Sequence, residues 1–206
     1  MIGNWFAENY IELLGVITSL IYLYFSIRQS FLLWPFGILS SALFIYIFYI
    51  NLLYADMSLQ GYYLLISIYG WHHWTKGTRK NNADKLPVTR IKSKTTISLF
   101  LIFILLWLSI AVILIYFTDS DVPWGDAFIT AGSIIGTWML ARKILEHWII
   151  WIIVDAVSVG LYLFKDMYPT ILLYFIYTII AVYGFFHWKK DISSPDDKMN
   201  LPTGTS

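Results

Sequence analysis

Seven predominantly apolar stretches, each about 17 to 22 residues long, dominate this 206-residue chain. An α-helix rises about 1.5 Å per residue, so roughly 20 residues are needed to cross the hydrocarbon core of a bilayer. Lipid offers no hydrogen bonds to the backbone, and segments of this kind are therefore expected to be helices. We predict membrane-spanning helices near residues 9–27, 33–51, 57–75, 96–117, 124–141, 145–164 and 168–188.

The composition agrees with an all-α integral membrane protein. Hydrophobic residues make up 58% of the chain and charged residues 13%, with a mean hydropathy of +0.65. A soluble domain carries about 25% charged residues. The absence of cysteine excludes a disulfide framework and a thiolate metal site. The sequence contains no phosphate-binding loop, nucleophile elbow, HExxH motif or nucleic-acid signature. We therefore expect that the protein is not an enzyme and has no cofactor, metal site or nucleic-acid partner.

Lysine and arginine are distributed unevenly between the two sides of the predicted membrane. Seven spans place the N-terminus and the loops 51–56, 118–123 and 165–167 on one side. Of the 14 Lys and Arg residues, only Lys165 lies there. Basic residues concentrate in cytoplasmic loops, so we predict an outer N-terminus and a cytoplasmic C-terminus.

An internal duplication relates the two halves of the sequence at one offset of 114 residues without a gap. Polar and aromatic residues coincide at this offset: Arg28 with Arg142, Trp34 with Trp148, Tyr63 with Tyr177, Tyr69-Gly70 with Tyr183-Gly184, and His73-Trp74 with His187-Trp188. Apolar residues often coincide by chance in a membrane protein. Arginine, glycine, histidine and tryptophan at one fixed offset do not.

This duplication predicts three helices in each half of the chain, with one connecting helix between the halves. Four crossings separate equivalent residues, so the repeats are parallel and related by an axis along the membrane normal, as in SWEET transporters. We predict a first triple-helix bundle at 1–75, a basic loop and connecting helix at 76–123, a second bundle at 124–190 and a disordered tail at 191–206. An inert duplicated scaffold is the alternative reading.

The strongest candidate for a ligand contact is Asp155, near the middle of the predicted span 145–164. A charged side chain at this depth costs about 2.5 to 3.5 kcal/mol on insertion scales, so it marks a functional site by default. On a helix, Trp148, Trp151 and Asp155 fall within about 60° of one another. Asp155 and Trp151 occupy the positions of Ser41 and Gly37 in the first repeat. The second half therefore carries an acidic and an aromatic residue on a helix face where the first half has serine and glycine. An acid beside aromatic rings suits a flat and positively charged ligand.

Each of these residues also has a structural reading. Asp155 would then bond a neighbouring helix, and a tryptophan near a helix end would anchor the chain at the membrane interface. Trp151 lies a turn deeper, which favours a ligand role. Further candidate binding residues are Trp34, Ser41, Gln60, Tyr63 and Tyr177. Asp126 and Arg142 match Glu12 and Arg28 across the repeats, and we interpret all four as structural.

Two segments resemble the PnuC family of vitamin transporters: LLYADMSLQGYYLLISIYGWHHW (52–74) and EHWIIWIIVDAVSVGLYLFKDMYP (146–169). The resemblance covers residues 5–190. Members that carry nicotinamide riboside have WxxWxxxN in the sixth span. Trp148, Trp151 and Asp155 make this motif WxxWxxxD, which is similar to the thiamine-transporting branch, PnuT.

The resemblance implies thiamine uptake by facilitated diffusion across the inner membrane of a bacterium, with phosphorylation in the cytoplasm preventing its return. It also implies a homotrimer. Asp155 would balance the thiazolium charge or bond the aminopyrimidine, and the indoles would stack on a ring. Nicotinamide riboside is also a cation, so it is the alternative substrate. An intramembrane enzyme, a receptor-like scaffold and a sugar transporter are further alternatives. No second catalytic group shares the Asp155 stripe, and that stripe suits a cationic ring better than a sugar.

Overall fold

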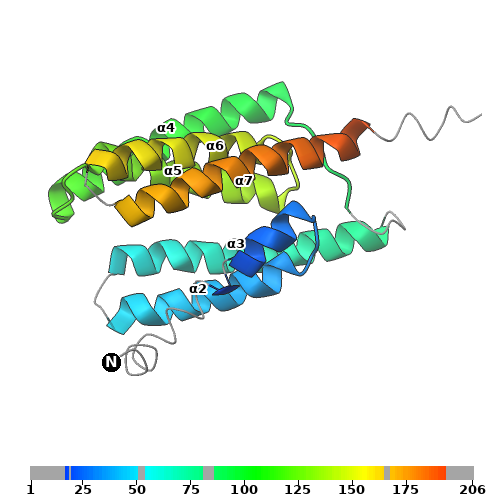
Figure 1. The fold of residues 1–206 in the computed structure, drawn as a ribbon, viewed down its shortest axis with the longest axis horizontal. Coiled ribbons are helices and arrows are strands. Elements are labelled where there is room, and N and C mark those ends of the chain that lie inside the picture. Colours follow the sequence, from blue (N-terminus) through cyan, green and yellow to red (C-terminus); the bar gives the residue numbers. More distant parts are fainter. Residues whose placement is uncertain (1–16, 19, 51–53, 81–85, 165–167, 194–206) are drawn as a thin grey trace, which may run out of the picture. The chain divides into compact units, whose positions relative to one another are not determined.

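The structure, a computed structural model, describes residues 17–18, 20–50, 54–80, 86–164 and 168–193 (Figure 1). Within these ranges residues 17–18 and 20–27 are helical, and six long helices follow. No strand occurs in the described ranges, apart from a single bridge between Thr89 and Ile144. The six helices are α2 (Leu33–Ile50), α3 (Tyr54–Lys80), α4 (Ser93–Phe117), α5 (Pro123–Ala141), α6 (His147–Phe164) and α7 (Tyr168–Ser193). The predicted all-α class is confirmed.

Four of the described helices are long and apolar enough to cross a membrane. They are α2, α4, α6 and the part of α7 from Thr170 to Ile192. Helix α3 carries several polar and basic side chains, and α5 is rich in Gly, Ser and Thr. These two helices are therefore less apolar than the others, and the total of seven crossings stays a prediction.

Two helices run beyond the apolar stretches predicted as membrane spans. Helix α3 continues to Lys80, into the predicted loop, and α7 continues to Ser193, into the predicted tail. The 27 residues of α3 span about 40 Å, more than the roughly 30 Å hydrocarbon core. Charged side chains do not end a helix in water, and the next prolines are Pro87 and Pro195. The remainder of the tail lies outside the described residues.

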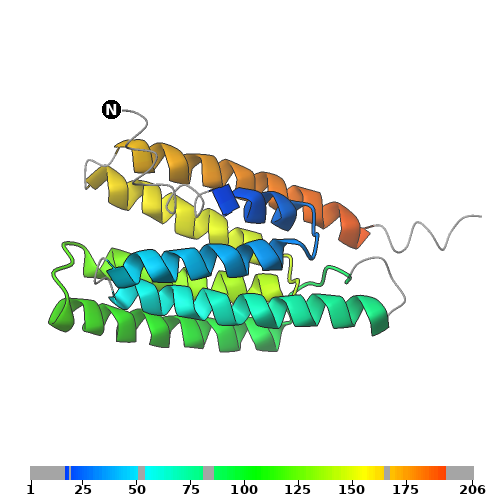
Figure 2. The ribbon, with the colours of Figure 1, turned by 90° about the horizontal axis from the view of Figure 1, so that it is seen from below.

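The chain divides into two compact units, Met1–Leu86 and Pro87–Ser206. In the first unit α2 packs on α3. In the second unit α5 packs on both α4 and α6, and α6 packs on α7. Both views show α6 and α7 running side by side along most of their length (Figures 1 and 2). The four-part division predicted above is not tested by this division into two units.

The turn that precedes α2 recurs in front of α6 with the same backbone geometry. Gln29 and Lys143, which are 114 residues apart, have positive φ angles of 54° and 55°. Their hydrogen bonds also correspond: the Ser30 amide donates to Phe25 O at 3.0 Å, and the Ile144 amide donates to Met139 O at 3.0 Å. A left-handed residue is uncommon outside glycine, so its recurrence at equivalent positions reflects a shared turn.

Each unit also holds one tryptophan against a glycine of the next helix. A Cβ atom added at Gly70 would collide with the Trp34 indole, and one added at Gly184 would lie 2.6 Å from the Trp148 indole. A second tryptophan meets each ring edge-to-face: Trp34 and Trp74 have centroids 5.4 Å apart, and Trp148 and Trp188 have centroids 5.8 Å apart. Glycine is required at both positions because the indole occupies the space of a side chain.

Candidate functional site

Asp155 is buried on α6, with 4% of its surface exposed. Its neighbours Val154 and Ser158 are also buried, and the Ser158 hydroxyl donates to the Val154 carbonyl oxygen at 2.8 Å rather than to the carboxylate. Within the described ranges no lysine, arginine or histidine forms an ion pair with Asp155. Burying an ionised carboxylate without a cation is costly, so this position has a strong preference for a positively charged partner.

Tyrosines of α7 lie close to this carboxylate. Tyr174 and Tyr177 both interact electrostatically with Asp155, and their rings meet edge-to-face with centroids 6.0 Å apart. Tyr174 also stacks on Tyr162 of α6 at 5.2 Å, and the two hydroxyls share a hydrogen bond. One carboxylate and three phenols are thus assembled from two neighbouring helices.

Tyr162 was not among the residues predicted from the sequence. It follows Asp155 by seven residues, which is two helical turns, and therefore lies on nearly the same face of α6. That spacing is the signal that would have identified it. In the first repeat the equivalent residue is Phe48, which has no hydroxyl, so a comparison of the repeats at this position would have identified it too.

Trp151 lies one turn before Asp155 and is half-buried. Its indole packs over Gly136 of α5, where an added Cβ would lie 3.3 Å from the ring. Trp148, in contrast, is 2% exposed and packs toward α7, where it contacts Gly184 and Trp188. The structure therefore turns the two predicted indoles toward different neighbouring helices. Trp151 is the more accessible of the two.

The predicted residues of the first unit form a second aromatic and polar group. Ser41 is buried, at 4% exposed, and Gln60 and Tyr63 are half-buried. Tyr63 lies beside Tyr62 with centroids 5.7 Å apart, and both interact electrostatically with Tyr22. Tyr22 was missed by the sequence analysis.

Trp34 is fully buried in the first unit, and its indole N–H has no hydrogen-bond partner among the residues that the structure describes. The same holds for the indole N–H of Trp148 in the second unit. Both rings fill the interior of a helix pair, where the apolar contact with a glycine holds the helices close together. The proximity of a ligand to either ring stays a prediction.

A large and a small residue exchange places between the two units. In the first unit Tyr22 packs over Gly37, where an added Cβ would lie 3.0 Å from the tyrosine ring. In the second unit the equivalent positions are Gly136 and Trp151, so the large ring now comes from the other helix. The helix packing is preserved, and in the second unit the ring comes from the helix that carries Asp155.

His147 is a further buried polar residue that the sequence analysis did not identify. Its Nδ1 lies 2.7 Å from the Ile144 carbonyl oxygen, and its Nε2 has no hydrogen-bond partner within the described part of the chain. The ring packs between Trp148 and Trp188, with both centroid distances 4.6 Å. Across the described ranges no three His, Cys, Asp or Glu residues are grouped for a metal ion. His147 therefore packs with the tryptophans as part of the helix junction.

The family model described as "Nicotinamide mononucleotide transporter" matches residues 9–190. The chain belongs to this family. The match covers nearly the whole chain and confirms the resemblance to PnuC proteins. It does not separate the thiamine branch from the others.

Relatives that are named for different substrates are similar to this chain. The nicotinamide riboside transporter PnuC of Escherichia coli K12 is 27% identical over 203 residues, covering 87% of this chain and 85% of that protein. The riboflavin/roseoflavin transporter RibM of Streptomyces davaonensis is 28% identical over 183 residues, covering 86% and 83%. These relatives are named as transporters, which agrees with the expectation that the chain is not an enzyme.

A solved structure supports the fold. The crystal structure of the vitamin B3 transporter PnuC aligns with a TM-score of 0.71 at 18% identity and covers 93% of this chain and 86% of that one. At this identity the match concerns the fold alone. The family and the general fold are therefore shown.

Proposed function

We propose that this protein carries thiamine across the inner membrane of a bacterium by facilitated diffusion. The observation that carries the proposal is the buried carboxylate of Asp155, which has tyrosines on one side and Trp151 one turn away. A carboxylate in an apolar setting favours a cation, and aromatic faces favour a flat ring. The relatives transport ring-containing vitamins by name, which supports the same class of substrate.

Thiamine fits this chemistry through its two rings. Its thiazolium carries a permanent positive charge, and its aminopyrimidine offers an amine donor. Asp155 would balance the charge or accept a hydrogen bond from the amine. Trp151 would stack on a ring, where a cation–π contact contributes about 0.5 to 2 kcal/mol. Tyr174 and Tyr177 would contribute hydroxyls, and Trp148 would hold α6 against α7 behind the site.

The proposal also assigns ligand contacts to the first repeat. In this proposal Ser41, Gln60 and Tyr63 face the ligand from the first bundle, and Trp34 holds α2 against α3. The arrangement proposed is two parallel triple-helix bundles joined by α4. The recurring turn at Gln29 and Lys143 supports it, as does the recurring tryptophan–glycine contact.

Transport would follow from rocking of the two bundles around this site. The distribution of basic residues supports an outer N-terminus and a cytoplasmic C-terminus. The sequence has no nucleotide-binding motif to drive pumping, so net uptake would depend on phosphorylation of thiamine in the cytoplasm. A homotrimer, as in the family it resembles, is part of the proposal.

Nicotinamide riboside is the second candidate substrate. Relatives from Escherichia coli and Neisseria mucosa are named as transporters of it, and it too is a cation with a flat ring. Competition distinguishes the two: each vitamin is titrated calorimetrically into purified protein, alone and with the other present. A dissociation constant for nicotinamide riboside below that for thiamine would assign the protein to the alternative.

Removing the charge of Asp155 tests the proposal most directly. We expect Asp155→Asn to weaken thiamine binding by about 30-fold or more, since truncating a buried charge pair costs about 2 to 5 kcal/mol. Isothermal titration calorimetry measures the dissociation constant. Asp126→Asn is the matched control, because Asp126 accepts a hydrogen bond from the Ser120 hydroxyl at 2.7 Å and lies near the start of α5. An unchanged dissociation constant in Asp155→Asn would falsify the anchoring role.

A further inference from the structure

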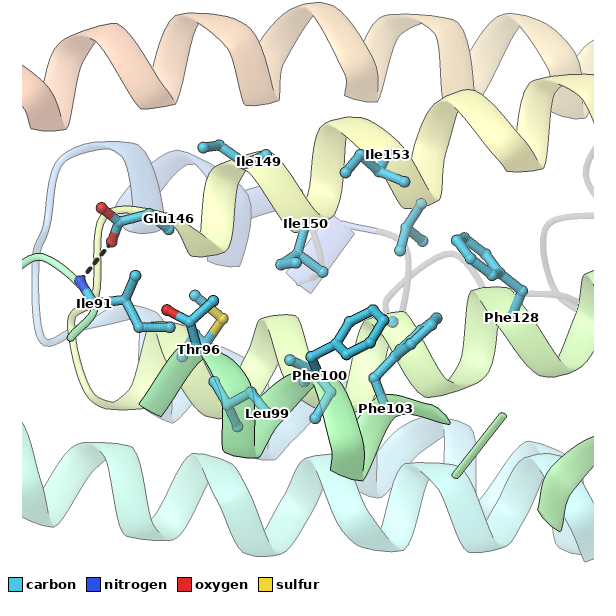
Figure 3. A pocket seen from close by; sticks show the side chains of 14 residues that line it. Ile91, Thr96, Leu99, Phe100, Phe103, Phe128, Glu146, Ile149, Ile150 and Ile153 are labelled. Atoms are coloured by element: carbon cyan, nitrogen blue, oxygen red, sulfur yellow. Dashed lines mark hydrogen bonds between the residues drawn. The ribbon is translucent and has the colours of Figure 1, made fainter. Parts of the chain in front are cut away.

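The second unit contains a cavity of about 330 Å³ between α4, α5 and α6 (Figure 3). Helix α4 contributes Leu99, Phe100 and Phe103 to its wall, and Phe128 comes from α5. Ile149, Ile150 and Ile153 of α6 complete the opposite side, as the close view shows. Asp155 is not among the lining residues, so this cavity is separate from the candidate site described above.

The wall of the cavity is apolar along nearly its whole length. Its polar groups are at one end: Thr96, whose hydroxyl donates to the Lys92 carbonyl oxygen at 3.2 Å, and Glu146, which accepts a hydrogen bond from the Ile91 amide at 2.9 Å. A pocket for a vitamin needs several polar groups that fix the orientation of its rings. This wall offers none beyond that end, and it suits a hydrocarbon chain.

The cavity opens toward the side of the helices rather than toward their ends. Its lining residues Phe100, Ile149 and Ile153 are 62%, 40% and 45% exposed. They continue into an exposed apolar face of α4 that includes Leu101 and Leu105. On helices that cross a membrane, such a face meets lipid, so a chain from the bilayer can enter sideways.

Three basic residues neighbour the lining residues at the polar end of the cavity along the chain. Arg90, Lys92 and Lys94 are all exposed, and they flank the lining residues Ile91 and Thr96. Glu146 is the acidic group there, and its carboxylate already binds the Ile91 amide. Basic clusters at the cytoplasmic end of membrane helices attract anionic lipid headgroups, by about 1 kcal/mol for each side chain.

This end of the cavity is held in a defined shape by the backbone. The Thr89 amide donates to the Lys143 carbonyl oxygen at 3.0 Å, and the Leu145 amide donates to the Thr89 carbonyl oxygen at 2.9 Å. The segment that carries Arg90 and Lys92 is thereby tied to the turn before α6. The three basic side chains thus project from a fixed rim rather than from a free loop.

We propose that the cavity binds one acyl chain of an anionic phospholipid, with the headgroup phosphate held by Arg90, Lys92 and Lys94. A helix of a second copy is about 10 Å wide and is too broad to enter a space of about 330 Å³. A single hydrocarbon chain is narrow enough, and its charged head would lie at the basic rim. The lipid would fill a space between α4 and α6 that otherwise leaves their side chains without contacts.

Photolabelling of the full-length protein in nanodiscs tests this assignment. The probe is phosphatidylglycerol with a diazirine near the end of one acyl chain, and the labelled peptides are located by mass spectrometry. We expect labels on the segments 96–103 and 146–154. Excess unlabelled phosphatidylglycerol should remove them, and a phosphatidylcholine probe should label these segments at least tenfold less. Labels spread evenly over all apolar helix faces would overturn the proposal.

Two sets of variants test binding of the acyl chain and binding of the headgroup separately. Ile153→Trp fills the cavity and should reduce labelling of 96–103 at least fivefold, whereas Leu105→Trp changes an exposed residue outside the lining and should not. Arg90→Gln, Lys92→Gln and Lys94→Gln together should abolish the preference for phosphatidylglycerol over phosphatidylcholine. The control with the same loss of charge is Lys76→Gln with Lys189→Gln and Lys190→Gln.

Each part of the lipid proposal has its own contradicting result. Equal labelling of the two tryptophan variants would overturn binding of the chain, and an unchanged lipid preference in the triple variant would overturn the role of the basic rim. Crosslinks between two copies at Phe100 or Ile153 would replace the lipid by a second copy of the protein. Thiamine binding and the melting temperature of each variant show whether it is folded. The labelling pattern of the wild type tests the proposal without any variant.

Discussion

The first and second units share the turn and the tryptophan–glycine contact that position their helices. They differ in the residues at the middle of those helices. Both have the same turn with a left-handed residue, at Gln29 and Lys143, and both have a tryptophan packed on a glycine. In the middle of the helices the second unit holds Asp155 where the first holds Ser41. The parts that position the helices have kept the turn geometry and the tryptophan–glycine pair, and the parts that would meet a ligand have diverged.

The large and small residues that exchange places between the units show the same difference. Gly37 lies under Tyr22 in the first unit, and Trp151 lies over Gly136 in the second. Each pair fills the same space with one ring, so either arrangement satisfies packing. What differs is the helix that supplies the ring. Only in the second unit does the ring lie one turn from a carboxylate on the same helix.

Substitution of the two conserved glycines should produce the largest change in stability. Gly70→Ala and Gly184→Ala each place a Cβ against an indole, and overpacking of this kind costs about 1 to 3 kcal/mol. We expect both variants to lower the melting temperature in detergent by similar amounts, measured by thermal unfolding of the purified protein. A similar loss in both would show that the two units use the contact in the same way.

Gly160→Ala is the matched control for these variants. Gly160 lies on α6, and no atom of the described residues lies within 4 Å of an added Cβ. Alanine is favoured over glycine in a helix by about 0.5 to 1 kcal/mol, so the melting temperature should stay the same or rise. A loss at Gly160 as large as at Gly184 would contradict the role assigned to the indole.

Exchanging the large and small residues of the second unit should affect binding more than folding. Trp151→Gly with Gly136→Tyr gives the second unit the pair found in the first. We expect thiamine affinity to fall about two- to 30-fold, because the aromatic contact beside Asp155 contributes about 0.5 to 2 kcal/mol. Isothermal titration calorimetry measures the loss.

The melting temperature of this double variant serves as its internal control. It should stay close to that of the wild type, because Tyr22 and Gly37 already pack in this way. Retained affinity with a normal melting temperature would remove Trp151 from the binding site and leave the difference between the units without a function.

Much of this architecture could be predicted from the sequence because lipid leaves a helix few alternatives. The apolar stretches located the helices, and the offset of 114 residues paired Trp34 with Trp148 and Gly70 with Gly184. The ends of α3 and α7 could not be predicted in the same way. Hydropathy detects where a helix leaves the membrane, whereas the helix itself ends only where its backbone hydrogen bonds end.

The candidate site was predicted less completely than the fold. Asp155 and Trp151 were identified because a buried acid and a deep indole are unusual in a membrane helix. The position of Trp148 depended on which neighbour its ring contacts, and helical periodicity does not specify the neighbour. Tyr22 and His147 were missed because an aromatic residue in an apolar stretch resembles ordinary core packing. Their significance comes from the partners across the helices.

The tyrosine pair beside Asp155 should have the smallest effect and therefore offers the finest test of the comparison. Tyr162→Phe removes a hydroxyl that shares a hydrogen bond with Tyr174, and Phe is already the equivalent residue in the first unit. Net hydrogen bonds contribute about 0.5 to 1.5 kcal/mol, so thiamine affinity should fall about two- to tenfold as Tyr174 loses its orientation. Calorimetry measures this change, with the exposed Tyr116→Phe as the matched control. If Tyr162→Phe binds thiamine as tightly as the wild type, the second unit owes its ligand contacts to the carboxylate and the indole, and the stacked phenols only join α6 to α7.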